Sequence, residues 1–252
     1  MPRTARKLSD TGIYHVMMRG VNKQEIFQDD EDRKKLLQIL KYYKGKYSIK
    51  VYAYCLMTNH VHLLIKDTNY KMDKFVKDMA GLYSRIYNTK YSRIGHLFQD
   101  RYKSEEVENQ DYLLSLIRYI HKNPEKAGIC KMKDYKWSSF KEYIFNEKII
   151  YKKDILEMYN ENNKKAIALF EHFSFQEDNN VYLDINNASR RTEKEIFDEI
   201  NLIICIKKLK ECNRTEKAEM IKKIIKIEGI NILQISKLTG VDRKTIYKYK
   251  RK

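Results

Sequence analysis

The chain has 252 residues, 42% of them hydrophobic, which is enough for one average domain with an appended module. Its 51 Lys and Arg residues exceed its 34 Asp and Glu residues by 17. This excess of positive charge favours a polyanionic partner, and nucleic acid is the first candidate. No apolar run approaches the ~20 residues of a spanning helix, no signal peptide is evident, and the four cysteines form no Cys-x-x-Cys pair, so we expect a cytoplasmic protein without a zinc ribbon.

The first part of the chain alternates extended segments with amphipathic helices. We predict extended structure over residues 13–19, 48–65 and 95–107, and helices over residues 30–46, 71–91 and 109–123. The second extended segment reads as two strands joined tightly at Thr58-Asn59. This strand-helix-strand-strand-helix-strand order predicts an α+β fold, a ferredoxin-like antiparallel sheet with helices on one face.

Two histidines lie two residues apart on the strand that follows Thr58-Asn59. Alternate side chains of a strand share a face, so His60 and His62 point one way while Val61 points to the core. Imidazole is the commonest protein metal ligand, so the pair predicts a metal site, although such pairs also occur as polar rims of sheets. His15 is more simply interpreted as a structural histidine of the first strand.

The helix that begins near Asn109 places a phenol and an amide one turn apart. Leu113, Leu116, Ile117 and Ile120 form its buried stripe, and Pro124 predicts that the helix ends near Asn123. Tyr119 and Asn123 lie four residues apart, off that stripe, and therefore on one face. The alternative is a helix whose tyrosine only packs and whose asparagine caps its end.

The remainder of the chain predicts a helical extension and linker over residues 146–192 and a basic helical domain over residues 193–252. In that domain, helices are predicted over residues 193–210 and 215–228, and apolar residues then flank Gly240, with Asp242 able to cap the next helix. This layout indicates a helix-turn-helix, although a plain helical hairpin is the alternative. The second helix carries five candidate DNA contacts: Arg243, Lys244, Thr245, Tyr247 and Lys248.

Several segments of residues 1–145 together resemble the REP-associated tyrosine transposases, a branch of the HUH tyrosine transposase (insertion-sequence transposase-like) family. They are residues 12–16 with Arg19-Gly20, and residues 57–64, 95–104 and 118–124. The resemblance implies an HUH nuclease domain over residues 1–145. It also implies that His60, His62 and Asn123 bind one Mg²⁺ or Mn²⁺ and that Tyr119 attacks DNA.

The same resemblance implies a metal-dependent single-strand DNA endonuclease and strand transferase that cleaves at hairpin-forming repeats through a 5′-phosphotyrosine. Such a protein is expected to act as a monomer or homodimer on DNA in a bacterial-type, nucleoid-containing cytoplasm, with no membrane partner. Five basic residues are candidates for phosphate contacts beside the site: Arg19, Arg101, Lys103, Arg118 and Lys122.

Two other functions stay open at this point. A DNA-binding regulator working through the helix-turn-helix, with an inactive nuclease-like domain, accounts for the charge but not for the combination of His60, His62, Tyr119 and Asn123. A zinc hydrolase of small substrates is compatible with imidazole ligands, since ligand chemistry alone leaves zinc open. It explains neither the basic composition nor the helix-turn-helix.

Overall fold

The computed structural model describes residues 7–177, 182–183, 200, 214–225, 235–236 and 239–250. The chain divides into two compact units, Met1–Leu183 and Asp184–Lys252. The domain boundaries predicted at residues 145 and 192 stay predictions. None of the described helices is long and apolar enough to cross a membrane.

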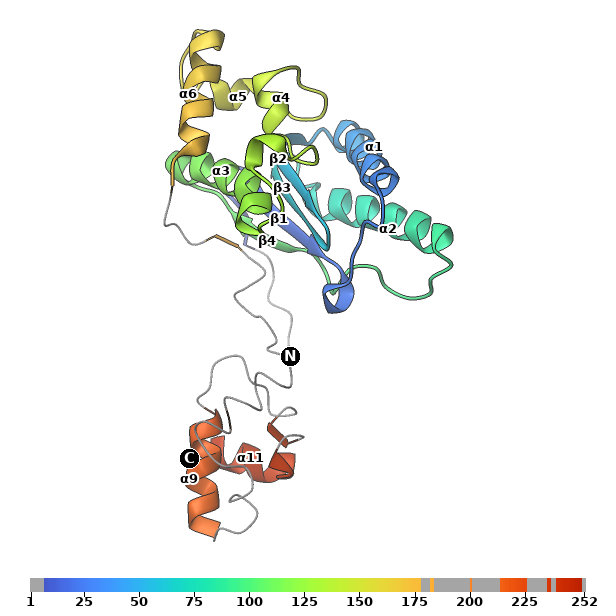
Figure 1. The fold of residues 1–252 in the computed structure, drawn as a ribbon, viewed down its shortest axis with the longest axis vertical. Helices are drawn as coiled ribbons and strands as arrows, with labels where there is room; N and C mark the ends of the chain where they lie inside the picture. The colour runs from blue at the N-terminus through green and yellow to red at the C-terminus, as the bar shows by residue number, and fades with distance from the viewer. Residues whose placement is uncertain are drawn as a thin grey trace. The chain divides into compact units, whose positions relative to one another are not determined.

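Four antiparallel strands form one sheet in the order β2-β3-β1-β4 (Figure 1). The strands are β1 (Ile13–Arg19), β2 (Lys50–Met57), β3 (His60–Lys66) and β4 (Lys103–Glu106). In the pairing of β1 with β3, His62 lies opposite Met17 and His60 opposite Arg19. This arrangement confirms the predicted α+β fold with a ferredoxin-like sheet.

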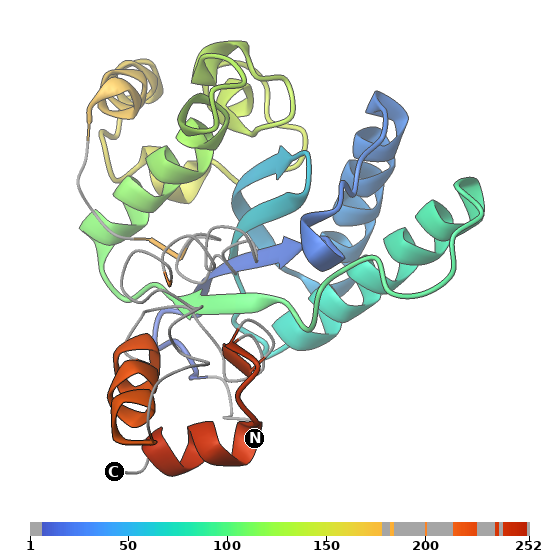
Figure 2. The same cartoon turned by 60° about the horizontal axis from the view of Figure 1, so that its bottom comes forward.

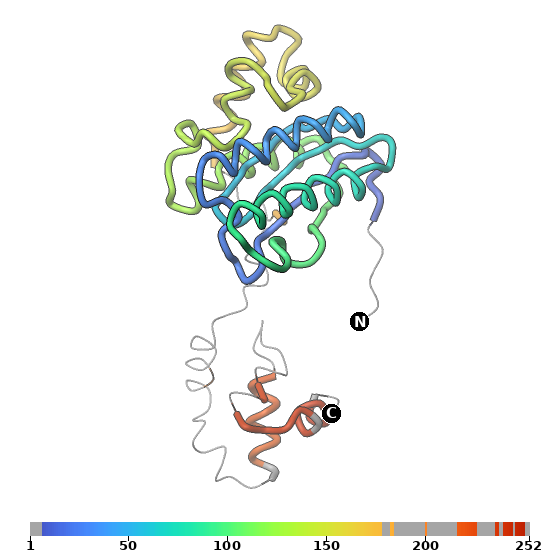
Figure 3. The backbone as a smooth tube through the Cα atoms, turned by 90° about the vertical axis from the view of Figure 1, so that its right-hand side faces the viewer, coloured from blue at the N-terminus to red at the C-terminus, as the bar shows by residue number. Residues whose placement is uncertain are grey.

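Helices cover both faces of this sheet: two lie together on one face, as predicted, and a third lies on the other face. α1 (Asp30–Tyr47) and α2 (Met72–Lys90) run side by side across one face (Figure 3), and α3 (Gln110–Lys126) crosses the other (Figure 2). The ring of His62 contacts Tyr119 of α3, so His62 points to the α3 face. By strand alternation, the fully buried Val61 and Leu63 point to the α1 and α2 face and form core there.

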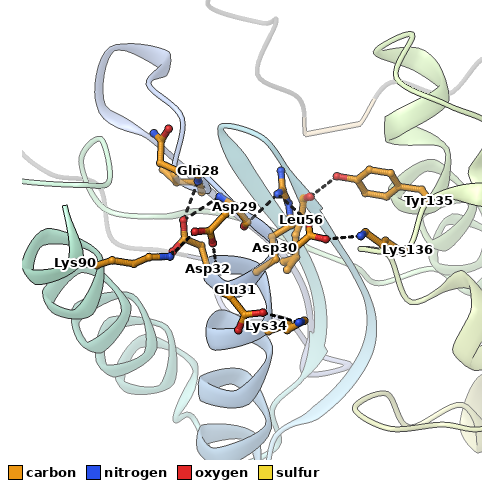
Figure 4. A network of polar contacts seen from close by, with 12 residues as sticks. Gln28, Asp29, Asp30, Glu31, Asp32, Lys34, Leu56, Lys90, Tyr135 and Lys136 are labelled. Atoms are coloured by element: carbon orange, nitrogen blue, oxygen red, sulfur yellow. Dashed lines mark hydrogen bonds and ion pairs between the residues drawn. The ribbon is translucent and has the colours of Figure 1, made fainter.

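Charged side chains fix the point where α1 begins (Figure 4). The Asp29 carboxylate accepts a hydrogen bond from the Asp32 backbone N–H at 2.9 Å, and the Asp32 carboxylate accepts one from the Asp29 N–H at 3.3 Å. This reciprocal capping box satisfies N–H groups that have no partner within the helix. Lys90 donates to both carboxylates, at 2.7 and 2.8 Å, and thereby ties the end of α2 to the start of α1.

The predicted end of α3 near Asn123 is wrong, because the helix continues to Lys126 with Pro124 inside its last turn. Proline lacks the N–H that would donate to the carbonyl of Ile120. The side-chain amide of Asn123 reaches that carbonyl at 3.5 Å and the carbonyl of Tyr119 at 2.9 Å. Side-chain hydrogen bonds thus replace part of what the proline removes, and the helix gains one more turn.

Short helices complete the first unit: α4 (Phe140–Ile144), α5 (Lys153–Leu156) and α6 (Asn163–Phe175), with 3-10 turns η1 (Val21–Lys23) and η2 (Met132–Asp134). α6 packs through Phe170, whose ring stacks on that of Tyr143 with centres 4.2 Å apart. In the second unit, α9 (Arg214–Ile225) and α11 (Arg243–Lys250) share an apolar core. The helix predicted over residues 193–210 lies outside the described residues apart from Ile200.

Candidate active site

The histidine pair stands at the start of β3, directly after the Thr58-Asn59 turn. His62 is fully buried and His60 is 9% exposed, and their ring centres lie 4.9 Å apart. Because alternate side chains of a strand share a face, both imidazoles lie on the sheet face that α3 covers.

Hydrogen bonds determine which nitrogen of each imidazole is available. His60 Nδ1 lies 2.7 Å from the side-chain oxygen of Asn59, which can only accept, so Nδ1 carries the proton and a metal would bind Nε2. His62 Nδ1 lies 2.9 Å from His15 Nε2. The other nitrogen, His62 Nε2, is buried and has no hydrogen-bond partner among the described residues. A buried nitrogen without a partner is costly unless a ligand uses it.

Burial also decides the charge of His62. Desolvation first, and then the neighbouring imidazoles of His60 and His15, hold the pKa of His62 well below its usual range. The ring is consequently neutral at neutral pH, and neutral imidazole is the form that binds metals.

Tyr119 lies on α3, above the buried imidazoles of His62 and His15. Its ring meets that of His62 edge-on, with centres 5.8 Å apart, and that of His15 at 6.3 Å. The side chain is 3% exposed. The predicted nucleophile Tyr119 and the predicted metal ligand His62 are therefore neighbours in space, although more than fifty residues separate them in the chain.

Asn123 follows Tyr119 by one helical turn and is 8% exposed. Its amide nitrogen donates to two backbone carbonyls of α3, which leaves the amide oxygen as the atom able to bind a cation. Within the described ranges, no group of three or more His, Cys, Asp or Glu side chains is placed to hold a metal. The Asn123 amide oxygen is of a ligand type suited to hard cations.

Comparison with known proteins places this constellation in a family. Residues 9–123 match the model of the family described as IS200-like transposases. Residues 9–123 therefore carry the sequence pattern of an IS200-like transposase domain. No curated protein matches the chain.

Two solved structures are similar to this chain. One is a REP-associated tyrosine transposase bound to a REP hairpin, with 15% identity, 60% of this chain and 91% of that chain covered, and a TM-score of 0.48. The other is a putative transposase from Deinococcus radiodurans, with 20% identity, 48% and 97% covered, and a TM-score of 0.34.

Three of the five basic residues predicted beside the site line open cavities of the transposase domain. Arg19 and Arg101 line a cavity of about 750 Å³ between α2 and residues 95–102. Arg101 and Lys103 line a second one of about 900 Å³ along residues 96–104. Both cavities follow the end of β1, where Gln99 N–H donates to the carbonyl of Arg19 at 2.7 Å.

The other two basic residues, Arg118 and Lys122, are not placed to meet DNA. Arg118 is 5% exposed, with its guanidinium 4.3 Å from the ring centre of Phe173. Lys122 is also covered and donates to the backbone carbonyl of Gln176 at 2.9 Å. Their shared helix face is occupied by α6, so we remove both from the candidate DNA contacts.

Four residues near the site were not among the predicted site residues. His15 Nε2 lies 2.9 Å from His62 Nδ1, and Glu105 Oε2 lies 3.9 Å from His15 Nδ1. Tyr182 stacks on Tyr119 with ring centres 4.4 Å apart, and Lys126 Nζ lies 4.6 Å from the Tyr119 ring centre. The seven-residue spacing from Tyr119 to Lys126 was a readable signal, because residues two turns apart share a helix face.

The second unit has two local features of the predicted helix-turn-helix. Gly240 adopts φ +71°, which glycine tolerates best, and the Asp242 carboxylate accepts a hydrogen bond from Thr245 N–H at 3.0 Å. Along α11, Arg243, Tyr247 and Lys248 are exposed and Thr245 is half-buried. The side chain of Lys244 lies outside the described set.

Proposed function

We propose that the transposase domain is a metal-dependent single-strand DNA endonuclease and strand transferase with Tyr119 as its nucleophile. The observation that carries the proposal is the buried Nε2 of His62, which has no protein partner among the described residues and whose ring contacts Tyr119. His60, His62 and Asn123 would hold one divalent cation, Mg²⁺ or Mn²⁺. Such a cation, when bound, neutralises charge that develops on a phosphate.

The residues of the chain perform the remaining chemistry. Tyr119 Oη forms a bond to phosphorus while the bond from phosphorus to the 3′ oxygen breaks. The phenol gives up its proton, and the departing oxygen takes one up as a 3′-hydroxyl. The resulting 5′-phosphotyrosine conserves the phosphodiester energy, so a second 3′-hydroxyl can attack it and join strands without ATP.

The charge of the molecule supports a DNA substrate. Arg19, Arg101 and Lys103 line the two cavities at the end of β1, and Arg19 lies opposite His60 in the sheet, so these side chains are candidates to contact a single strand through its phosphates. Lys126, beside the Tyr119 ring, is a fourth candidate contact. We propose a hairpin-bearing single strand as substrate, and duplex contacts by Arg243, Thr245, Tyr247 and Lys248 in the second unit, with Lys244 retained from the sequence prediction. The monomeric or homodimeric state and the cytoplasmic location stay predictions.

A gel assay of covalent adducts tests this proposal. A hairpin oligonucleotide labelled at its 3′ end is incubated with Mn²⁺, and the label should migrate with the protein on a denaturing gel, because the downstream fragment keeps the phosphotyrosine. Tyr119→Phe should abolish the adduct and keep hairpin binding. Tyr112→Phe tests the other tyrosine on the same helix face: it loses the hydrogen bond from its hydroxyl to Glu105 at 2.9 Å and should still form the adduct. An adduct lost only in Tyr112→Phe, or one unaffected by EDTA, contradicts the mechanism.

A further inference from the structure

We propose that His15 and Glu105 are positioning residues of the metal site, which hold His62 in the tautomer whose Nε2 lone pair is available to a cation. The inference rests on the proposed function, because it assigns a task toward the same metal. It adds two residues that the mechanism above does not use.

Three neighbouring strands place these residues in a row. Glu105 on β4 lies directly opposite His15 on β1, and His15 lies beside His62 of β3 on the same face. His15 Nε2 is 2.9 Å from His62 Nδ1, and His15 Nδ1 is 3.9 Å from Glu105 Oε2. The other carboxylate oxygen, Oε1, accepts from the Tyr112 hydroxyl at 2.9 Å. A carboxylate anchored by a tyrosine thus stands behind two imidazoles.

The direction of each contact follows from the carboxylate. His15 first, and the Tyr112 hydroxyl among the further causes, hold the pKa of Glu105 below its usual range, so the group is ionised and can only accept. The nearest nitrogen, His15 Nδ1, is therefore the one that carries the proton in a neutral ring, and His15 Nε2 has the lone pair. That lone pair accepts from His62 Nδ1–H, and His62 Nε2 is left as a lone pair inside the site.

Packing alone does not account for an imidazole at position 15. The same strand face carries Met17 two residues later, buried to 3% exposure, so an apolar side chain suits this surface. His15 is fully buried and polar, and burying a polar ring has a cost that only its hydrogen bonds offset. A hydrogen-bond acceptor behind a metal-binding imidazole orients that ligand, and losing such a partner weakens metal affinity by about 10–100-fold.

The experiment measures Mn²⁺ binding to the full-length protein without DNA. Calorimetry or the loss of the free-ion electron paramagnetic resonance signal, with MnCl₂ as the only ligand, should show His15→Leu binding about 10–100-fold more weakly than the wild type. His15→Gln should recover most of the affinity, because an amide can accept from His62 and donate to Glu105. His121→Leu is the control: His121 is equally buried but bonds Ser139 at 2.7 Å among aromatic rings away from the site.

A second measurement reads the tautomer directly in the metal-free wild type. Two-bond ¹H–¹⁵N correlations of ¹⁵N-histidine-labelled protein should show His62 protonated on Nδ1, and His15→Leu should shift the population toward the Nε2–H form. Wild-type protein that binds no Mn²⁺ would contradict the proposed function itself. Two other results would overturn the positioning role alone. One is equal Mn²⁺ affinity of the wild type and His15→Leu, and the other is a wild-type His62 that is protonated on Nε2. If His15→Leu does not fold, the wild-type tautomer and His15→Gln decide.

Discussion

Replacing Tyr182 by alanine tests whether this side chain shields the proposed nucleophile, Tyr119, from DNA. Tyr182 is 4% exposed and its ring lies nearly parallel to that of Tyr119, at 22°, with centres 4.4 Å apart. The Tyr119 hydroxyl is itself buried. A scissile phosphate can reach that oxygen only after the covering group moves, so Tyr182 has to leave the stack before attack.

The contacts of Tyr182 set the size of the effect. Its ring stacks on Tyr119 and, at 5.7 Å, on Tyr112, and Lys126 Nζ lies 5.9 Å from its centre. Each ring pair contributes about 0.5–1.5 kcal/mol and the cation–π contact about 0.5–1 kcal/mol, hence roughly 1.5–4 kcal/mol together. Since about 1.4 kcal/mol is a factor of ten, the uncovered fraction is roughly one in ten to one in several hundred.

The assay is the initial rate of covalent adduct formation with the 3′-labelled hairpin and Mn²⁺. Tyr182→Ala should raise that rate by roughly ten- to several-hundred-fold at equal protein and DNA concentrations, by the same conversion. Tyr159→Ala is the control, because Tyr159 also contacts aromatic rings, those of Phe170 and Phe173, away from the site. An unchanged rate in a folded Tyr182→Ala protein would refute the shielding argument, and a lower rate would make Tyr182 part of the DNA-binding surface.

Three further predictions concern stability and the second unit. Burial lowers the pKa of His121 to about 3 from the usual histidine value of 6.5, so the unfolded chain binds more protons than the folded protein between these two pH values. The stability of the wild type should therefore fall by about 2 kcal/mol from pH 7 to pH 5 through this group. Urea unfolding at pH 7 and pH 5 should show this loss of stability in the wild type and not in His121→Leu. The same pH dependence of stability in both proteins would contradict the prediction. Asp32→Ala should lower the free energy of unfolding by about 2–3 kcal/mol, because it removes half of the capping box and one of the two acceptors for Lys90. Glu31→Ala, at the neighbouring exposed residue, should change the free energy of unfolding by less than about 0.5 kcal/mol. A chain ending at residue 192 should keep adduct formation but bind duplex DNA more weakly, with a salt dependence reduced by about one unit per lost phosphate contact; unchanged duplex binding would assign the second unit another role.

The sequence by itself determined the parts of this protein that depend on local periodicity. The alternation of a strand was enough to predict that His60 and His62 share a face, and the sheet pairing agrees with it. The helical repeat was enough to place Tyr119 above Asn123. The order of strands and helices predicted the sheet, because each element's apolar pattern is contained within its own segment. The end of α3 failed for the opposite reason, since a single residue, Asn123, compensates for Pro124 through its side chain.

Only the tertiary structure decided which residues from distant segments meet. His15 acquires its partners because β1 lies between β3 and β4, an order that no pattern within β1 reveals. Arg118 resembles a free basic residue in the sequence, yet α6 covers it with Phe173. Tyr182, from a segment without sequence periodicity, stacks on Tyr119. Each of these contacts joins groups more than forty residues apart, and their energies depend on which face of a helix or sheet another element covers.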